Sequence, residues 1–216
     1  MAIQLPAQDW PNLERFRAAN AALAAPVAGT PRVVFMGNSI TEGWLQDSTS
    51  FFHTEPDYVN RGISGQTTPQ MLIRFRPDVI ELRPDVVVIL AGINDIAENT
   101  GPLPIEAVAG NLFSMAELAE AHGISVVLSA VLPADDFPWR PGMDPAPKVH
   151  ALKALLKTYA AERGHVYLDY YNPLVNATGG LNPELAYDGV HPTAEGYRRM
   201  QALAEVAIRE ALEKRR

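Results

Sequence analysis

The chain has 216 residues, 47% of them hydrophobic and 20% charged, so we expect one domain with a full core spanning residues 1–216. Its formal net charge is −7, and no basic stripe with interleaved aromatic residues occurs, which argues against a nucleic-acid partner. Because cysteine is absent, disulfides, thiolate metal sites and a cysteine nucleophile are excluded.

Two hydrophobic periodicities alternate along the sequence. Short β-branched runs bounded by Gly, Pro or Asp predict strands buried on both faces over 32–36, 58–60, 85–91, 125–130 and 166–168. Helical spacing predicts helices over 11–25, with Asp9 as its N-cap, and over 68–81, 105–122, 146–163 and 193–213. Strands that alternate with helices predict a three-layer α/β/α sandwich around a five-stranded parallel sheet.

Polar segments follow the first four predicted strands. Residues 37–41, 60–68 and 92–95 follow the first, second and third strands, and the carboxyl ends of parallel strands meet at the ligand-binding edge of the sheet. We therefore expect these segments to converge. Residues 133–147, which include five prolines and Trp139, follow the fourth strand and are predicted to form a rim or lid over the same edge.

Ser39 stands where the first strand breaks at Gly37 and a helix begins, a position at which α/β folds expose a nucleophile. The same serine fits a capping box, because Glu42 follows three residues later. Both interpretations stay open on this segment alone. A serine nucleophile also needs a base to take its proton.

Asp188 and His191, near the other end of the chain, could supply that base. An aspartate three residues before a histidine in a non-helical turn can bind Nδ1 and leave Nε2 facing outward. This pairing would fix the tautomer that a general base needs. The alternative is a plain turn at Asp188 and Gly189, with Pro192 at the first position of the final helix.

Three groups are candidates for an oxyanion hole: the amide of Ser39, the amide of Gly65 and the side-chain NH₂ of Asn94. Taken singly, Gly65 is explained by a turn and Asn94 by an Asx-turn after a strand. Their order at the ends of successive strands favours the catalytic interpretation. The sequence has no His-Glu-x-x-His motif, Walker motif or dinucleotide fingerprint, so we expect no metal and no cofactor.

These blocks resemble those of the SGNH hydrolase superfamily, also called the GDSL esterases and lipases. The matching blocks, in the family's order, are Gly37-Asn38-Ser39-Ile40, the Gly65 segment, Gly92-Ile93-Asn94-Asp95 and Asp188-Gly189-Val190-His191. The resemblance implies that superfamily's flavodoxin-like fold, with Ser39 as nucleophile, His191 as base and then acid, and Asp188 as its orienting partner. It also implies an oxyanion hole formed by Ser39, Gly65 and Asn94.

One residue departs from the family pattern. Asn38 stands where the family usually has aspartate, and we expect it to alter local hydrogen bonding without changing the reaction type. The chain lacks a Gly-x-Ser-x-Gly elbow, so the larger α/β-hydrolase family fits less well.

The expected activity is hydrolysis of carboxylic esters through a Ser-His-Asp acyl-enzyme mechanism. A short acyl group is favoured because no extended apolar surface for a long chain can be identified. Acetyl on a carbohydrate is the leading case, since Trp139 could stack on a sugar ring, although a core role for Trp139 is equally compatible. The alternatives are a lysophospholipase or acyl-thioesterase and, in another class, a catalytically silent carbohydrate- or lipid-binding module.

The expected partner is a small-molecule ester, and association into a homo-oligomer stays open. Residues 1–10 lack a basic start followed by an apolar run, and the longest apolar stretch, 86–91, is too short to span a bilayer. The sequence as given therefore predicts a cytoplasmic protein without stable membrane insertion. A leader removed earlier would leave the same sequence.

Overall fold

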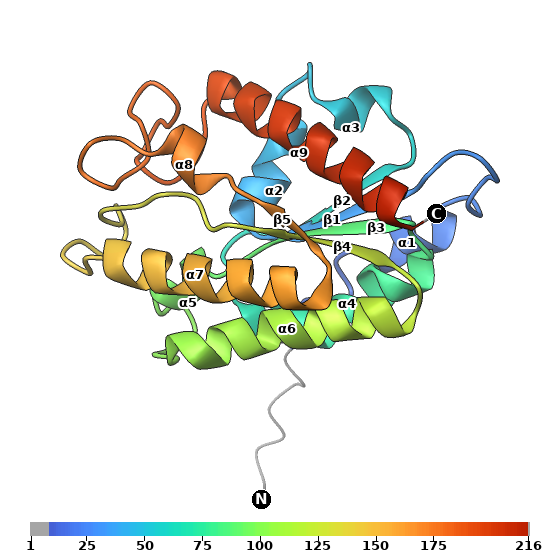
Figure 1. Ribbon diagram of the computed structural model, residues 1–216, viewed down its shortest axis with the longest axis horizontal. Coiled ribbons are helices and arrows are strands. Elements are labelled where there is room, and N and C mark those ends of the chain that lie inside the picture. Colours follow the sequence, from blue (N-terminus) through green and yellow to red (C-terminus); the bar gives the residue numbers. More distant parts are fainter. Residues whose placement is uncertain (1–8, 216) are drawn as a thin grey trace, which may run out of the picture.

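The computed structural model describes residues 9–215 and contains one parallel sheet of five strands in the order β2-β1-β3-β4-β5 (Figure 1). The strands are β1 (Val33–Gly37), β2 (Tyr58–Gly62), β3 (Val86–Leu90), β4 (Ser125–Ser129) and β5 (Val166–Leu168). All the predicted strands are confirmed, with small shifts at their ends.

The longer helices also follow the predictions. They are α4 (Thr68–Asp78), α6 (Ile105–Ala121), α7 (Ala146–Arg163) and α9 (Ala194–Lys214). Shorter α-helices are α1 (Arg17–Ala22), α2 (Ser39–Gly43), α3 (Phe51–Thr54), α5 (Ile93–Ile96) and α8 (Tyr171–Leu174). Two 3₁₀ turns, η1 (Trp44–Gln46) and η2 (Ile80–Leu82), complete the helical elements of the described chain.

The helices cover both faces of the sheet, which confirms the three-layer sandwich. In Figure 1, α4, α6 and α7 lie below the sheet, whereas α2, α3 and α9 lie above it. Every residue of β1 and β3 is buried, which explains why these strands are continuous apolar runs instead of alternating patterns.

The predicted helix over 11–25 is wrong in extent, because only α1 within it is helical. Asp9 does accept hydrogen bonds from the amides that follow it, but Asn12 adopts a left-handed φ of 58°. The carbonyl of Pro11, which a helix would need for its own ladder, instead accepts a hydrogen bond from Gln66 at 2.8 Å. Tertiary contacts to this backbone thus replace the first helical turns.

The carboxyl ends of three neighbouring strands are level with one another. Gly37, at the end of β1, is in register with Gly62 of β2 and Leu90 of β3. The segments that follow these three strands therefore emerge side by side at one edge of the sheet, as the sequence predicts.

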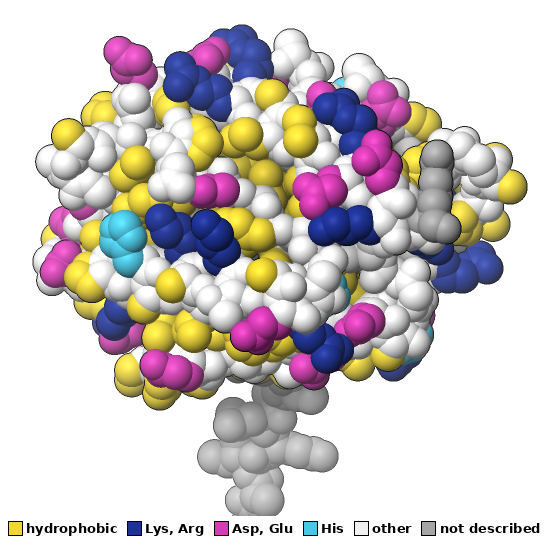
Figure 2. Space-filling view, in the orientation of Figure 1, with side chains coloured by type: hydrophobic (Ala, Val, Ile, Leu, Met, Phe, Trp, Pro, Cys, Tyr) yellow, Lys and Arg dark blue, Asp and Glu magenta, His cyan; other side chains and the backbone are white. Residues whose placement is uncertain are grey.

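Charged side chains of both signs are interspersed over the face formed by α9, α7 and α6 (Figure 2). On α9, Glu195 pairs with Arg198 and Arg199, and Glu210 pairs with Lys214. No helix within residues 9–215 is both long enough and apolar enough to cross a membrane.

Candidate active site

Ser39 is the first residue of α2, and Asn38 alone separates it from the end of β1. The side chain of Asn38 caps this helix by accepting a hydrogen bond from the amide of Ile40 at 3.0 Å. Glu42 does not reach back to the helix start, because its carboxylate accepts from the amide of Ser64 at 2.8 Å. The capping-box interpretation of Ser39 is therefore wrong, and Asn38 takes the capping position.

Ser39 and His191 meet although 152 positions separate them in sequence. The distance from Ser39 Oγ to His191 Nε2 is 2.8 Å, and the distance from His191 Nδ1 to Asp188 Oδ2 is 2.7 Å. Because a carboxylate only accepts hydrogen bonds, Nδ1 donates to Asp188 and Nε2 is left to accept the serine proton. The three groups form a continuous proton path.

A tight turn holds the Asp188 carboxylate against the imidazole. Asp188 Oδ1 accepts from the amides of Val190 at 3.0 Å and His191 at 2.7 Å, and Gly189 supplies a left-handed φ of 81°. Partial burial acts to raise the pKa of Asp188, but these hydrogen bonds outweigh burial and lower the pKa below its ordinary value. The carboxylate consequently stays ionised beside the ring.

The start of α9 ties this turn to the serine helix. Thr193 caps α9 by accepting from the amide of Gly196 at 3.3 Å, and Pro192 precedes this cap in a bridge to Ala186. The expected place of Pro192 at the first helical position is therefore wrong. In the first turn of α9, the Tyr197 hydroxyl donates to the carbonyl of Ile40 at 2.9 Å, which joins α9 to α2.

The oxyanion candidates lie on neighbouring segments of the same edge. Gly65 has a left-handed φ of 76°, in a loop whose Ile63 amide donates to the carbonyl of Gly37 at 3.1 Å. Asn94 is buried at the start of α5, and its Nδ2 donates to the carbonyl of Gln66 at 2.9 Å. A carboxamide has two N–H groups, so one remains available to an oxyanion.

Asp95 joins α5 to the start of α4, a role that the sequence did not predict. Its carboxylate accepts from the amide of Thr68 at 3.0 Å and from the Thr68 hydroxyl at 2.7 Å. Burial raises the pKa of Asp95 to about 6, although the hydrogen bonds from Thr68 act in the opposite direction. The sequence indicates this role only through the position of Asp95, a second polar residue directly after Asn94.

Arg74 supports the site from inside the molecule and was also missed. Its guanidinium donates to the carbonyls of Gly37 at 3.1 Å and Arg61 at 2.9 Å, and it pairs with Asp78 at 3.0 Å. Burial lowers the pKa of Arg74, while the Asp78 charge opposes that shift. The sequence could have indicated this role, because Arg74 lies at helical spacing among the apolar residues that α4 buries.

Two aromatic rings lie beside the imidazole. Trp139 is 41% exposed with its ring centroid 6.2 Å from that of His191, and Tyr187 is 72% exposed at 5.8 Å with nearly parallel rings. The segment 133–147 thus forms a rim beside the site. A core role for Trp139 is wrong, because its neighbour Phe137 fills the core instead. Tyr187, beside Asp188, was missed.

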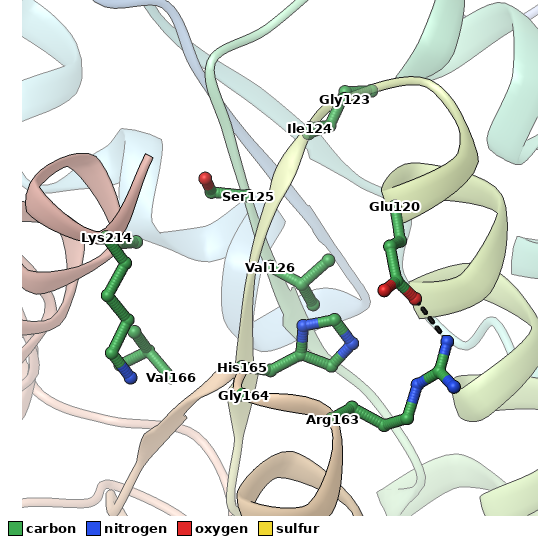
Figure 3. A pocket seen from close by; sticks show the side chains of 11 residues that line it. Glu120, Gly123, Ile124, Ser125, Val126, Arg163, Gly164, His165, Val166 and Lys214 are labelled. Atoms are coloured by element: carbon green, nitrogen blue, oxygen red, sulfur yellow. Dashed lines mark hydrogen bonds and ion pairs between the residues drawn. The ribbon is translucent and has the colours of Figure 1, made fainter. Parts of the chain in front are cut away.

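A separate hollow opens at the opposite edge of the sheet, where β4 and β5 begin (Figure 3). Figure 3 shows Lys214 on one side of it and the ion pair of Glu120 with Arg163 on the other. None of the predicted site residues lines this hollow.

Comparison with known proteins gives strong matches. The model of the GDSL-like lipase/acylhydrolase family matches residues 35–199. The crystal structure of a GDSL-like lipase from Bacteroides thetaiotaomicron VPI-5482 is 50% identical with a TM-score of 0.90, and the match covers 94% of this chain and 99% of that one. Esterase TesA from Pseudomonas aeruginosa is 27% identical over 170 residues, which cover 77% of this chain and 78% of TesA.

Two further similarities are narrower. An 80-residue stretch is 35% identical to the uncharacterized lipoprotein YqeF of Bacillus subtilis, covering 36% of this chain but only 33% of that protein. An acetylxylan esterase from Geobacillus stearothermophilus is 20% identical with a TM-score of 0.67, over 86% of this chain and 96% of that one. At that identity the similarity shows a shared fold.

Proposed function

Since this chain belongs to the GDSL-like lipase/acylhydrolase family and is a serine esterase, we propose that it hydrolyses esters through an acyl-enzyme formed on Ser39. The observation that carries this proposal is the proton path from Ser39 Oγ through His191 to Asp188, at 2.8 Å and 2.7 Å. The three side chains already lie within hydrogen-bond distance of one another, so the serine proton can pass to His191 without a rearrangement of the triad.

The reaction has two halves that use the same base. Ser39 Oγ attacks the ester carbonyl carbon while its proton passes to Nε2 of His191, and Asp188 stabilises the resulting imidazolium. The tetrahedral intermediate expels the alcohol, which takes the proton from Nε2 as it leaves. Water then attacks the acyl-enzyme and gives a proton to Nε2. The second tetrahedral intermediate releases the acid, and Ser39 Oγ takes the proton back from Nε2 as its bond to the acyl carbon breaks.

We assign three hydrogen-bond donors to stabilise the negative charge that develops on the carbonyl oxygen. They are the amides of Ser39 and Gly65 and the second N–H of Asn94, whose first N–H is bound to the carbonyl of Gln66. Because Asn94 is only 3% exposed, its dipole lies in a medium that screens it weakly. Preorganised donors of this kind favour the intermediate over the flat ester carbonyl.

For the substrate class we propose short acyl esters, with acetyl on a carbohydrate as the leading case. The partly exposed rings of Trp139 and Tyr187 both lie beside the imidazole that protonates the leaving alcohol. Flat aromatic faces suit the C–H face of a sugar ring, and two of them beside one reactive group favour a ring-shaped alcohol over a flexible one.

A fluorophosphonate probe tests the nucleophile directly. We expect the wild-type protein to be labelled at Ser39 with loss of esterase activity, because the probe reports a serine activated by a base. The Ser39→Ala variant should be neither labelled nor active. Active wild-type enzyme that resists labelling would contradict the serine mechanism.

A chain-length series of p-nitrophenyl esters tests the acyl group. We expect kcat/KM to be highest for acetate and to fall as the acyl chain lengthens. A maximum at long acyl chains would instead support a lysophospholipase or acyl-thioesterase. Release of acetate from acetylated xylo-oligosaccharides, compared with p-nitrophenyl acetate, then tests the carbohydrate half.

A further inference from the structure

A chain of directed hydrogen bonds runs from the rim of the site to Asn94. Trp139 Nε1 donates to Asn99 Oδ1 at 3.2 Å, and Asn99 Nδ2 donates to Asn94 Oδ1 at 3.1 Å. Asn94 Nδ2 then donates to the carbonyl of Gln66 at 2.9 Å. This series of hydrogen bonds therefore begins at the exposed indole of Trp139 and ends at Asn94, the proposed oxyanion donor.

Each group in this chain fixes the orientation of the next. An indole N–H only donates, so it turns the oxygen of the Asn99 carboxamide toward Trp139 and the NH₂ toward Asn94. The Asn99 NH₂ can only donate, so it pairs with the oxygen of the Asn94 carboxamide. A flipped Asn94 would set its NH₂ against the NH₂ of Asn99 and its oxygen against the carbonyl of Gln66, two repulsive contacts.

The backbone holds Asn99 at this position. Its amide donates to the carbonyl of Asn94 at 3.0 Å, and Glu98 before it adopts a left-handed φ of 57°. Arg140, next to Trp139, donates to the carbonyls of Ala97 at 2.6 Å and Glu98 at 3.0 Å. The rim and the turn that carries Asn99 are thus joined by the Arg140 guanidinium as well as by the indole.

We propose that Asn99 is a positioning residue for ester hydrolysis, which orients the Asn94 carboxamide toward the oxyanion and is itself oriented by Trp139. This inference rests on the proposed function, since it assigns Asn99 to act through Asn94.

Steady-state kinetics with p-nitrophenyl acetate test the proposal. We expect Asn99→Ala to lower kcat about three- to tenfold, the range of one hydrogen bond, with little change in KM. Trp139→Phe, which keeps the ring but loses the donor, should lower kcat by about twofold to fivefold. Asn172→Ala serves as a matched control, because Asn172 is exposed and its side chain bonds to Asp169, which takes no part in the hydrogen bonds from Trp139 to Asn94.

A double-mutant cycle separates positioning from general damage to the fold. In the Asn94→Ala background, Asn99→Ala should cause no further loss of kcat, because its effect passes through the missing carboxamide. A loss of equal size in both backgrounds, or wild-type kcat in Asn99→Ala, would overturn the positioning role. Hydrolysis that persists in Ser39→Ala would instead overturn the proposed function, so the two failures are distinguishable.

Discussion

The pairing of Asp188 with His191 decides which imidazole nitrogen can act as a base. Nδ1 faces the carboxylate at 2.7 Å, and Asp188 is kept ionised by amides within its own turn. Nε2 is therefore the nitrogen that faces Ser39 Oγ, and only a neutral imidazole can accept the serine proton there. The chemistry of the site follows from this one assignment of protons.

The tautomer of His191 should control the rate of ester hydrolysis, because a ring held by Asp188 at Nδ1 leaves Nε2 to accept the serine proton. The measurement is kcat/KM for p-nitrophenyl acetate, with the rate in Ser39→Ala subtracted as background. Asp188→Asn should lower kcat/KM by about a thousandfold or more, since the ring loses the partner that fixes its tautomer. An unchanged kcat/KM in Asp188→Asn would contradict the assignment of His191 as base.

Removal of the Asn94 carboxamide should slow the reaction without unfolding the protein. We expect Asn94→Ala to lower kcat by about a hundredfold or more, the usual cost of one oxyanion donor. KM should change much less, because the donor acts mainly on the tetrahedral intermediate. Circular dichroism checks that the fold is retained, and unchanged turnover would remove Asn94 from the oxyanion hole.

At the level of elements, the site depends on strands that end level with one another. Gly37, Gly62 and Leu90 are in register, so the loops beyond them deliver polar residues to one place. Added contacts then lock these loops together, most directly the carboxylate of Asp95 on the start of α4 at Thr68. Each element thus positions its neighbour as well as its own functional side chain.

The buried Asp95 carboxyl should make stability depend on pH. Its pKa is about 6 in the folded protein against an ordinary value of 3.8, so the folded state binds this proton more tightly. The contribution of Asp95 is therefore largest below pH 3.8 and is lost as the pH rises through 6, by up to about 3 kcal/mol.

Urea unfolding of wild type and Asp95→Asn between about pH 4 and pH 7 measures this effect. As the pH rises, the free energy of unfolding of Asp95→Asn minus that of the wild type should increase by about 1–3 kcal/mol. Glu213→Gln, a substitution at an exposed carboxyl near the end of α9, is the control and should follow the wild type. Parallel profiles for wild type and Asp95→Asn would contradict the shifted pKa.

At the level of the whole molecule, α9 brings the two halves of the catalytic machinery together. Its first turn follows His191, and Tyr197 in that turn binds the carbonyl of Ile40 on the serine helix. The rest of α9 packs on β3, β4 and β5, so the position of His191 is set by the central sheet. Function here depends on the packing of the C-terminal helix.

We expect the chain to unfold as one unit, in keeping with a single domain over residues 1–216. Buried apolar residues of the sheet and of the helices on both of its faces form one hydrophobic cluster. Far-ultraviolet circular dichroism and the fluorescence of Trp44, which is buried beside Phe35, should therefore give coincident urea transitions. Two separated transitions would contradict the single-domain prediction.

The sequence by itself determined the order and type of the main elements and drew attention to Ser39, Gly65, Asn94, Asp188 and His191. Runs buried on both faces and helical spacing are local patterns, and residues next to strand ends can be read directly from them. The short turn from Asp188 to His191 is also local, which is why its pairing could be predicted.

The tertiary structure alone decided the rest. Contacts of Asn99 with Trp139, and of Arg74 with the ends of β1 and β2, join residues far apart in sequence, so no local pattern contains them. The helix expected over 11–25 failed for the same reason, since side chains from α4 and the preceding loop bind the carbonyls of Trp10 and Pro11, where that helix would begin. Propensity acts within a few residues, whereas burial and long-range hydrogen bonds choose among the alternatives that it leaves open.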